Sequence, residues 1–280
     1  MTEPTETPRT VLVTGATDGL GRALAHDLAA SGAELILHGR SPERLDRLVA
    51  ELVAGGAGEP RTVVADFAEL AQVRRMAEEV RATAGRLDVL VNNAGVGGGE
   101  PDGRTRRTSA DGHELRLAVN HLAGFLLTLE LLPLLRASAP ARVVNVASLG
   151  QYPIDFDDLM LEHGYDGWRA YRQSKLAQIM CGFELAGRLP AGEVTVNSLH
   201  PATYMPTKMV LADLGRSVDT LEEGLAATRR LVLAPELATT TGRFYDRIRE
   251  SQAHAQAYDA AARRRLWDRS VELTGAPTPA

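Results

Sequence analysis

The stretch TVLVTGATDGLGRALAHDLAA, residues 10–30, decides the fold of this chain. The segment from Arg9 to Thr14, with which it begins, contains the apolar run Val11-Leu12-Val13 and is typical of a strand buried on both faces. A turn from Gly15 to Gly21 follows, and Leu20 to Ala30 then repeats apolar residues at helical spacing. Glycines let the backbone approach an anion closely, and a helix N-terminus supplies unpaired N–H groups and a partial positive charge. The spacing T-G-x-x-x-G-x-G therefore predicts a site for the pyrophosphate of a dinucleotide.

The same alternation of short apolar runs and longer helical segments continues along the chain. Strands are predicted at residues 34–38, 61–65, 87–92, 142–146 and 194–199, and helices at 42–53, 70–84, 114–136, 171–189 and 221–234. Strands that alternate with helices of this length build βαβ units around a parallel sheet. We therefore expect an α/β fold, doubly wound, with a central parallel sheet of about seven strands flanked by helices.

The chain is expected to form one domain, because neither a linker nor an internal repeat divides it. This domain runs from residue 9 to residue 275, between a flexible N-terminal tail (1–8) and a C-terminal tail (276–280). Ligands of such sheets bind beyond the carboxyl ends of the strands. The loops at 96–112, 150–170 and 203–219 all follow strands and are predicted to line the substrate pocket.

The bulk composition narrows the class of protein. The 280 residues carry a net charge of −5 without a basic stripe, so we expect no nucleic-acid partner. Cys181 is the only cysteine, which favours a reducing compartment. Residues 1–8 lack the apolar core of a signal peptide, and no apolar run reaches the roughly 18 residues of a membrane span. We expect a cytoplasmic protein with a small-molecule substrate, no membrane span and no metal site.

The end of the second strand bears on the choice of dinucleotide. NAD sites usually place an acidic residue here for the ribose 2′-hydroxyl, whereas this chain has Leu37-His38-Gly39-Arg40. A guanidinium binds a phosphate through paired, charge-assisted hydrogen bonds. We therefore predict NADP(H) in preference to NAD(H), although Arg40 as an ordinary exposed charge is the alternative. Asp18 would repel a 2′-phosphate unless its carboxylate instead orients Arg40.

Further motifs follow in order along the chain. They are Asp66-Phe67 after the third strand, Asn92-Asn93-Ala94-Gly95 after the fourth, Val119-Asn120-His121 in the long helix, Ser148 at the end of the fifth strand, and the pair Tyr171 and Lys175. Each motif is weak alone, but all of them together form a specific signal. Over about residues 9–275 the chain resembles the short-chain dehydrogenase/reductase family. The retinol-dehydrogenase-like and WW-domain-oxidoreductase-like branch is the most similar, on the run VNHLAGF (119–125) and on Leu266-Trp267.

The resemblance implies a Rossmann-type domain and, together with the glycine turn and Arg40, assigns the site. The catalytic residues would be Asn120, Ser148, Tyr171 and Lys175. The cofactor would contact Gly15, Thr17, Asp18, Gly19, Leu20, Gly21, Arg40, Asp66, Phe67, Asn93, Ala94, Gly95, Val119, Tyr171, Lys175, Pro201 and Thr203, and the substrate pocket would include Gly150, Gln151, Tyr204 and Met205. The resemblance also implies a homodimer or a homotetramer.

The catalytic residue types suit acid–base chemistry coupled to hydride transfer. Tyr171 and Lys175 lie four residues apart on a predicted helix and share one face, so the ammonium favours the phenolate. Tyr171 would give a proton to a carbonyl oxygen during reduction, or take one from an alcohol during oxidation. Ser148 would hydrogen-bond the same oxygen. By resemblance, Lys175 would also hold the nicotinamide ribose, and Asn120 would support a water that links Lys175 to solvent.

Two departures from the family pattern bear on the substrate. The family's Pro-Gly turn after the sixth strand is Pro201-Ala202 here, and Thr207 comes one residue later than the family's usual threonine. Thr203 is a candidate replacement for it. The loop after Gly95 is enlarged and rich in glycine. A specialised substrate, polycyclic or from secondary metabolism, is the resulting hypothesis.

Two other functions stay open from the sequence. The same scaffold serves imine, hemiaminal or amine oxidoreductases, because the catalytic residues work in both directions and on both kinds of bond. A regulator that binds NADP(H) without turnover is the second alternative. Such a protein would be expected to lose Tyr171 or Lys175, and this chain keeps both. The sequence therefore favours an NADP(H)-dependent ketoreductase or alcohol dehydrogenase.

Overall fold

The central sheet has eight strands in the order β3-β2-β1-β4-β5-β6-β7-β8. This computed structural model describes residues 8–99, 103–190, 192–207, 210–211 and 215–279. The strands are β1 (Thr10–Val13), β2 (Glu34–Gly39), β3 (Arg61–Val64), β4 (Val89–Asn92), β5 (Ala141–Val146), β6 (Val194–His200), β7 (Phe244–Asp246) and β8 (Arg249–Ser251). All neighbours pair in parallel except β7 and β8, which are antiparallel. The α/β class is confirmed, with eight strands where about seven were expected.

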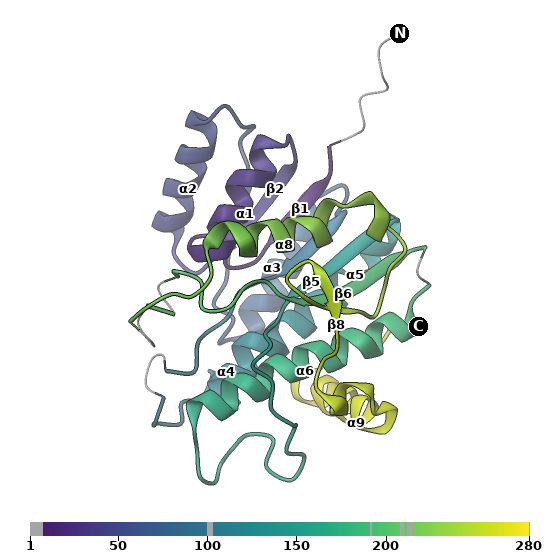
Figure 1. Cartoon of the computed structure of the whole chain (residues 1–280). Coiled ribbons are helices and arrows are strands. Elements are labelled where there is room, and N and C mark those ends of the chain that lie inside the picture. Colours follow the sequence, from purple (N-terminus) through teal and green to yellow (C-terminus); the bar gives the residue numbers. More distant parts are fainter. Residues whose placement is uncertain (1–7, 100–102, 191, 208–209, 212–214, 280) are drawn as a thin grey trace.

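Helices cover both faces of the sheet (Figure 1). On β1, Val11 and Val13 pack into one hydrophobic cluster, whereas Leu12 packs into the other, because successive side chains of a strand point to opposite faces. The first cluster includes residues of α1 (Gly19–Ala30), α2 (Pro42–Ala54) and α8 (Leu221–Leu233); the second includes residues of α3 (Leu70–Thr83), α5 (Ala123–Ala137), α6 (Gly167–Arg188) and α9 (Ala260–Thr274). The doubly wound arrangement is therefore confirmed.

The strand order reverses direction between β1 and β4. From β1 the chain builds outward to β2 and β3, and it then returns to place β4 on the other side of β1. Two chain segments thus diverge at the carboxyl ends of β1 and β4, which opens the crevice where doubly wound sheets bind ligands. The glycine turn after β1 and the N-N-A-G run after β4 both lie at this edge.

The helix that carries Asn120 contains a π-helical segment. Residues 115–137 form α4 (Leu115–Leu117), the π-helix η1 (Ala118–Leu122) and α5 without interruption. This run corrects the expectation that no segment is long and apolar enough to span a membrane: Leu115–Ala137 has 23 residues with an 18-residue window of mean hydropathy 1.6. The expectation looked for uninterrupted apolar residues, whereas isolated charges leave the mean high. In this fold 83% of that window is buried.

The C-terminal elements were not anticipated as such. Strands β7 and β8 have three residues each, too short to show an alternating pattern. Helix α9 packs on α6 and buries Trp267. Of the expected tails, residues 1–7 lie outside the described part of the chain, and Ala276 is buried rather than free in solvent.

Candidate active site

The glycine turn after β1 has no room for side chains at its three glycines. Gly15 and Gly19 adopt positive φ angles of 65° and 49°, which favour glycine. A Cβ on Gly21 would lie 2.2 Å from the carbonyl oxygen of Gly15. The first turn of α1 therefore packs directly on the turn that precedes it. This backbone cradle at a helix N-terminus fits a pyrophosphate group.

Asp18 caps α1 and pairs with an arginine that the sequence did not single out. Its carboxylate accepts a hydrogen bond from the Gly19 amide (2.8 Å) and forms an ion pair with Arg44 (2.8 Å). Arg44 also donates to the carbonyl oxygen of Thr17 (3.1 Å). Arg40 is exposed directly after β2. The sequence left open whether Asp18 repels a phosphate or orients Arg40; in the structure Asp18 pairs with Arg44, on the first turn of α2.

His38 links the glycine turn to the loop after β3. Its Nδ1 accepts a hydrogen bond from the Gly15 amide (3.2 Å), so Nε2 carries the proton donated to the Ala65 carbonyl oxygen (3.0 Å). The ring of Phe67 stacks on His38 with centroids 4.3 Å apart and is 4% exposed. Phe67 was predicted to contact the cofactor, but here its ring is buried against His38. Burial lowers the pKa of His38 to about 4.

The N-N-A-G run fastens β4 to the glycine turn. The Asn93 side chain donates to the carbonyl oxygens of Thr14 (2.8 Å) and Gly15 (3.2 Å). The amides of Asn93 and Ala94 both donate to the Thr14 hydroxyl (2.9 and 3.0 Å). These bonds hold the two strands at the crevice in a fixed relation. They place Asn93 and Ala94 beside the cradle, where the sequence predicted cofactor contacts.

Tyr171 and Lys175 share one face of α6. The Lys175 Nζ lies 5.9 Å from the ring centroid of Tyr171 and donates to the carbonyl oxygen of Val146 (2.8 Å). The side chain is buried, and this desolvation lowers the pKa of Lys175 to about 8. At neutral pH most of the population is therefore still an ammonium, as a partner for a phenolate requires.

Ser148 is oriented by the two residues that follow Leu149. The Gly150 amide donates to the Ser148 hydroxyl oxygen (3.0 Å), which leaves the hydroxyl proton available to a substrate oxygen. Gln151 donates to the Ser148 carbonyl oxygen (2.8 Å) and accepts from the His254 amide (2.6 Å). Gln151, predicted for the substrate pocket, thus braces Ser148 against the C-terminal segment.

Asn120 lies in the π-helical segment and is held by three hydrogen bonds. Its Oδ1 accepts from the Val96 amide (2.7 Å), and its Nδ2 donates to the Val96 carbonyl oxygen (3.1 Å) and to the Ser174 hydroxyl (2.9 Å). Gly95 lies between the two catalytic helices, because a Cβ there would be 3.0 Å from Asn120 Oδ1 and 3.7 Å from Lys175 Nζ. The structure therefore brings Asn120, Ser148, Tyr171 and Lys175 to one edge of the sheet.

In the loop after β6, Thr203 and Thr207 do not occupy the positions that the sequence predicted. The Thr203 hydroxyl is hydrogen-bonded to His200 (3.0 Å) and Arg247 (3.2 Å), and its amide donates to Asp219 (2.6 Å). These contacts tie Thr203 to the base of its own loop. Thr207 instead lies over the glycine turn, since a Cβ on Gly19 would be 2.9 Å from its methyl carbon. Thr207, rather than the predicted Thr203, is the threonine beside the cradle.

The remaining predicted pocket residues divide between surface and core. Tyr204 has a φ of 47° and is 42% exposed, so it forms part of the rim. Met205 packs against α8, because a Cβ on Gly224 would be 2.2 Å from its sulfur. Pro201, which was predicted as a cofactor contact, is buried directly after β6. Tyr204 therefore lies at the surface of the loop after β6, whereas Met205 packs against α8.

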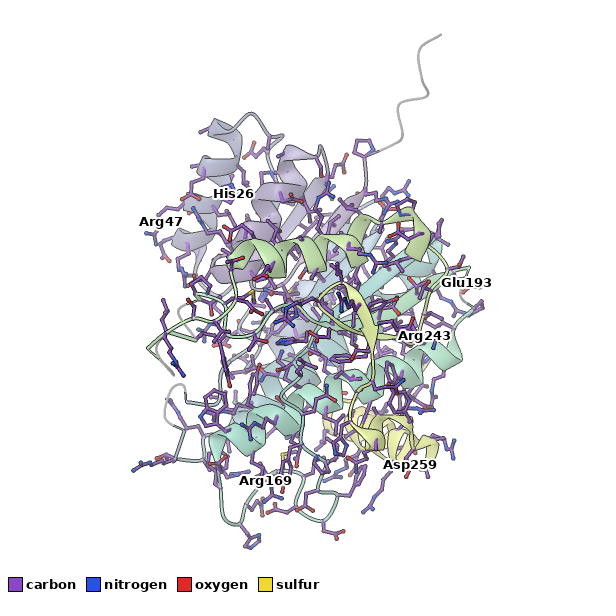
Figure 2. All side chains as sticks on the ribbon, in the orientation of Figure 1. His26, Arg47, Arg169, Glu193, Arg243 and Asp259 are labelled. Atoms are coloured by element: carbon purple, nitrogen blue, oxygen red, sulfur yellow. The ribbon has the colours of Figure 1, made fainter. Side chains whose placement is uncertain are left out.

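Arg44 and His38 are functional candidates that sequence reasoning missed, and Thr207 is one that it passed over in favour of Thr203. Arg44 follows the helix-start signal Ser41-Pro42, so its place on the first turn of α2 was readable, but its proximity to Asp18 was not. Arg47, one turn further along α2, is exposed at the outer side of the fold (Figure 2). Among the described residues, no group of three or more His, Cys, Asp or Glu side chains is arranged to hold a metal ion.

Comparison with known proteins gives a consistent result. The family model described as short chain dehydrogenase matches residues 9–214. Retinol dehydrogenase 14 of Mus musculus is 38% identical over 95% of this chain and 86% of its own. A candidate daunorubicin C-13 ketoreductase of Streptomyces sp. (strain C5) is also 38% identical, over 95% of this chain and 93% of its own. A Shigella flexneri 2a short chain dehydrogenase complexed with NADP is 25% identical, with a TM-score of 0.69 over 85% of this chain and 96% of that one.

Proposed function

The chain belongs to the short-chain dehydrogenase family, and we propose that it transfers hydride between NADP(H) and the carbonyl or alcohol carbon of a small organic molecule. The observation that carries this proposal is the convergence of Tyr171, Lys175, Ser148 and Asn120 beside the close-packed glycine turn. NADP(H), when bound, supplies the hydride; the chain supplies orientation and the proton.

The proton chemistry follows from the contacts of each residue. The Tyr171 hydroxyl gives its proton to the carbonyl oxygen during reduction. The Ser148 hydroxyl donates to the same oxygen, because the Gly150 amide bonds to its oxygen and leaves its proton free to be donated. The Lys175 ammonium, 5.9 Å from the Tyr171 ring centroid, stabilises the phenolate that remains. Asn120 fixes the loop at Val96 and so closes the crevice behind Lys175.

NADP(H) is proposed as the preferred cofactor on the strength of two arginines. Arg40 is exposed after β2, and Arg44 reaches the Thr17 carbonyl oxygen within the glycine turn. Two guanidiniums at this corner suit the extra phosphate of NADP(H). Asp18, which would repel that phosphate, has its charge paired with Arg44 in the structure. The NADP complex of the Shigella flexneri relative is consistent with this preference.

The substrate is proposed to be a bulky, largely apolar alcohol or ketone. Leu149, Tyr152 and Tyr204 are each more than 40% exposed, on the loops that follow β5 and β6. Exposed apolar side chains on loops that follow the strands of the site suit apolar ligands. Two relatives are named for retinol and for the C-13 ketone of daunorubicin, which agrees with this class of substrate.

The first experiment is to titrate the protein with NADPH and NADH by fluorescence and then add a panel of ketones, aldehydes and imines. We expect NADPH to bind more tightly and bulky apolar ketones to be reduced. Tyr171→Phe should lower kcat by a factor of about 10²–10⁴ and leave the Kd of NADPH within about twofold. Ile248→Ala, a change at an exposed side chain between β7 and β8, serves as control.

The possible outcomes separate the candidate functions. Turnover of imines but not of ketones would replace the proposed reaction with the imine alternative. Tight NADPH binding without turnover on the whole panel would favour the non-catalytic regulator. Full activity in Tyr171→Phe would refute the assignment of the proton donor, and the absence of binding of either nucleotide would refute the proposal entirely.

A further inference from the structure

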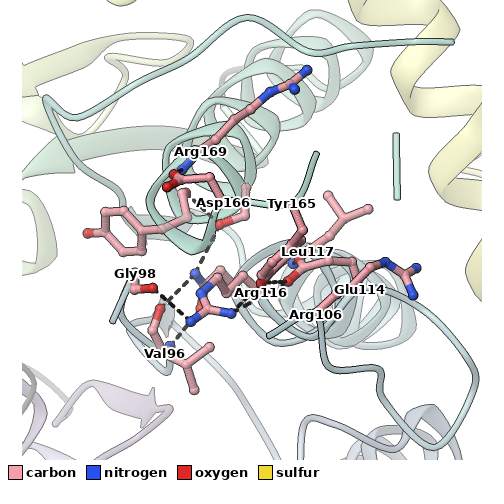
Figure 3. Close-up of polar contacts among 12 residues, drawn as sticks. Val96, Gly98, Arg106, Glu114, Arg116, Leu117, Tyr165, Asp166 and Arg169 are labelled. Carbon is pink, nitrogen blue, oxygen red and sulfur yellow. Dashed lines mark hydrogen bonds and ion pairs between the residues drawn. The ribbon is translucent and has the colours of Figure 1, made fainter. Parts of the chain in front are cut away.

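One arginine beside the catalytic residues has no solvent exposure. Arg116 lies on α4, one turn before Asn120, and its side chain is 0% exposed (Figure 3). The guanidinium donates from Nε to the Gly97 carbonyl oxygen and from Nη2 to the Gly98 carbonyl oxygen, both at 2.8 Å. The planar fork of arginine thus grips two successive peptide groups of the glycine-rich loop after β4.

The remaining nitrogen of the guanidinium, Nη1, is bonded to Tyr165, which connects it to Glu114. Arg116 Nη1 donates to the Tyr165 hydroxyl (2.5 Å), which donates in turn to Glu114 Oε1 (2.9 Å). The other Glu114 oxygen accepts from the Leu117 amide (2.7 Å), and Glu114 Oε1 is 3.8 Å from the arginine. A buried charge pair is tolerated only when hydrogen bonds of this kind satisfy it. We call Glu114, Arg116 and Tyr165 the arginine clamp.

The loop that the arginine clamp holds contacts Trp168, which packs next to Tyr171. A Cβ on Gly98 would lie 2.4 Å from the Trp168 ring, and a Cβ on Gly167 would lie 2.3 Å from the Gly98 carbonyl oxygen. Loop and helix start are therefore in direct contact. Trp168 packs edge-on against Tyr171 with ring centroids 6.0 Å apart. A shift of the Gly98 carbonyl would be passed through Trp168 to the proposed proton donor.

The same loop also contacts Asn120. Val96, next to the gripped Gly97, makes two hydrogen bonds with the Asn120 side chain (2.7 and 3.1 Å). Arg116 and Asn120 lie four residues apart and reach adjacent peptides of one loop. The clamp thus acts on two of the four proposed catalytic side chains without reaching the glycine cradle that holds the cofactor.

We propose that the arginine clamp is a positioning device that sets the glycine-rich loop, and through it Trp168, Tyr171 and Asn120, in the arrangement needed for proton transfer. Its members are positioning residues: each acts through the loop. The inference rests on the proposed function, because it assigns the clamp a part in that reaction. Near-attack geometry is demanding, and a misplacement of about 1 Å can cost roughly a hundredfold in rate.

The test compares two buried arginines of similar build. Arg142 also forks onto two main-chain carbonyl oxygens, those of Leu231 and Ala234, but it lies at the start of β5, away from the catalytic edge. Lysine keeps the charge and loses the planar fork. Arg116→Lys and Arg142→Lys should both lower the Tm, whereas only Arg116→Lys should lower kcat, by roughly tenfold to a hundredfold. The Kd of NADPH should stay within about twofold in both variants.

Two further measurements keep the test decisive. Tyr165→Phe removes only the hydroxyl that bridges the arginine and Glu114, and it should lower kcat by roughly threefold to tenfold while the protein stays folded. Hydrogen exchange of the peptide that covers residues 95–99 should be faster in Arg116→Lys than in Arg142→Lys. This second readout needs no substrate.

The outcomes distinguish this inference from the proposed function. Equal losses of kcat in Arg116→Lys and Arg142→Lys, or unchanged hydrogen exchange of the loop in Arg116→Lys, would overturn the clamp. Wild-type protein without turnover would refute the proposed function and the catalytic part of the clamp. Faster loop exchange in Arg116→Lys would even then support the hold of Arg116 on the loop.

Discussion

Arg44 is the side chain on which the proposed preference for NADP(H) depends most. Its guanidinium is paired with Asp18 and with the Thr17 carbonyl oxygen. The side chain already reaches the glycine turn, so little rearrangement is needed to meet a phosphate. Its pairing with Asp18 also offsets the repulsion that a lone carboxylate would exert on such a ligand.

Arg44→Ala is therefore expected to weaken the binding of NADPH more than that of NADH. Loss of a charge-assisted contact with the 2′-phosphate costs about 1.5–3 kcal/mol, which corresponds to roughly tenfold or more in the Kd of NADPH. Fluorescence titration with both nucleotides measures the difference. Arg47→Ala, on the exposed side of the same helix, should change neither Kd. Equal weakening of NADPH and NADH would show that Arg44 does not contact the 2′-phosphate.

At the scale of elements, the agreement between sequence and structure depends on length. Long helices such as α2, expected at 42–53 and observed at Pro42–Ala54, contain enough turns for their apolar spacing to be recognised. The three-residue strands β7 and β8 contain too few residues to show a period. Helix α9 has its own start signal at Asp259, but what it packs against cannot be read from that signal.

Helix α9 is held to the domain by an aromatic anchor. Trp267 is 1% exposed, meets Phe125 edge-on at 4.9 Å and has the Arg188 guanidinium 4.4 Å from its ring centroid. Trp267→Ala should lower the free energy of unfolding by about 3–5 kcal/mol, because it leaves a cavity between α9, α5 and α6. Urea denaturation gives this value.

The matched control for α9 is a large apolar residue at the surface. Ile248→Ala, at a side chain that is 56% exposed, should change the free energy of unfolding by less than about 0.5 kcal/mol. If the free energy of unfolding falls equally little in Trp267→Ala and Ile248→Ala, the packing of α9 contributes less to stability than the burial of Trp267 indicates.

For the whole molecule, buried histidines link stability to pH. His38 and His121 are both 2% exposed, and burial lowers their pKa values to about 4 and about 3. His200 is buried beside Asp246 and Arg247, and its pKa is lowered to about 4, chiefly by desolvation. Unfolding returns each ring to solvent and to its ordinary pKa of about 6.5.

The free energy of unfolding should consequently fall as the pH decreases from about 6.5 towards 4. In this window the unfolded chain binds protons that the folded chain excludes, so stability is lost by up to about 1.4 kcal/mol per pH unit for each buried histidine. Urea denaturation at several pH values measures the slope. His121→Gln retains an N–H for Ser270 but does not titrate, and it should make the slope shallower.

A variant that changes no titratable group provides the control for this pH dependence. Ile248→Ala, at an exposed side chain, should leave the slope as it is in the wild-type protein. A slope of the same size in His121→Gln and the wild type would indicate that carboxyl groups, not buried rings, cause the acid sensitivity.

Local sequence patterns predict the order of strands and helices as far as α8, the glycine turn and the pair Tyr171 and Lys175. These features depend on residues close together in the chain: apolar period, positive φ at Gly15 and Gly19, and a spacing of four on a helix. Such patterns depend only on neighbouring residues, so they can be recognised in the sequence without knowledge of the tertiary contacts.

Which side chains contact one another across the site became known only from the tertiary structure. It paired Asp18 with Arg44, buried Phe67 against His38, placed Thr207 over Gly19 and closed the arginine clamp on the glycine-rich loop. Each contact joins residues separated by tens or hundreds of positions, and each depends on how the layers pack around the sheet. Packing of that kind is a property of the whole fold, and no local spacing encodes it.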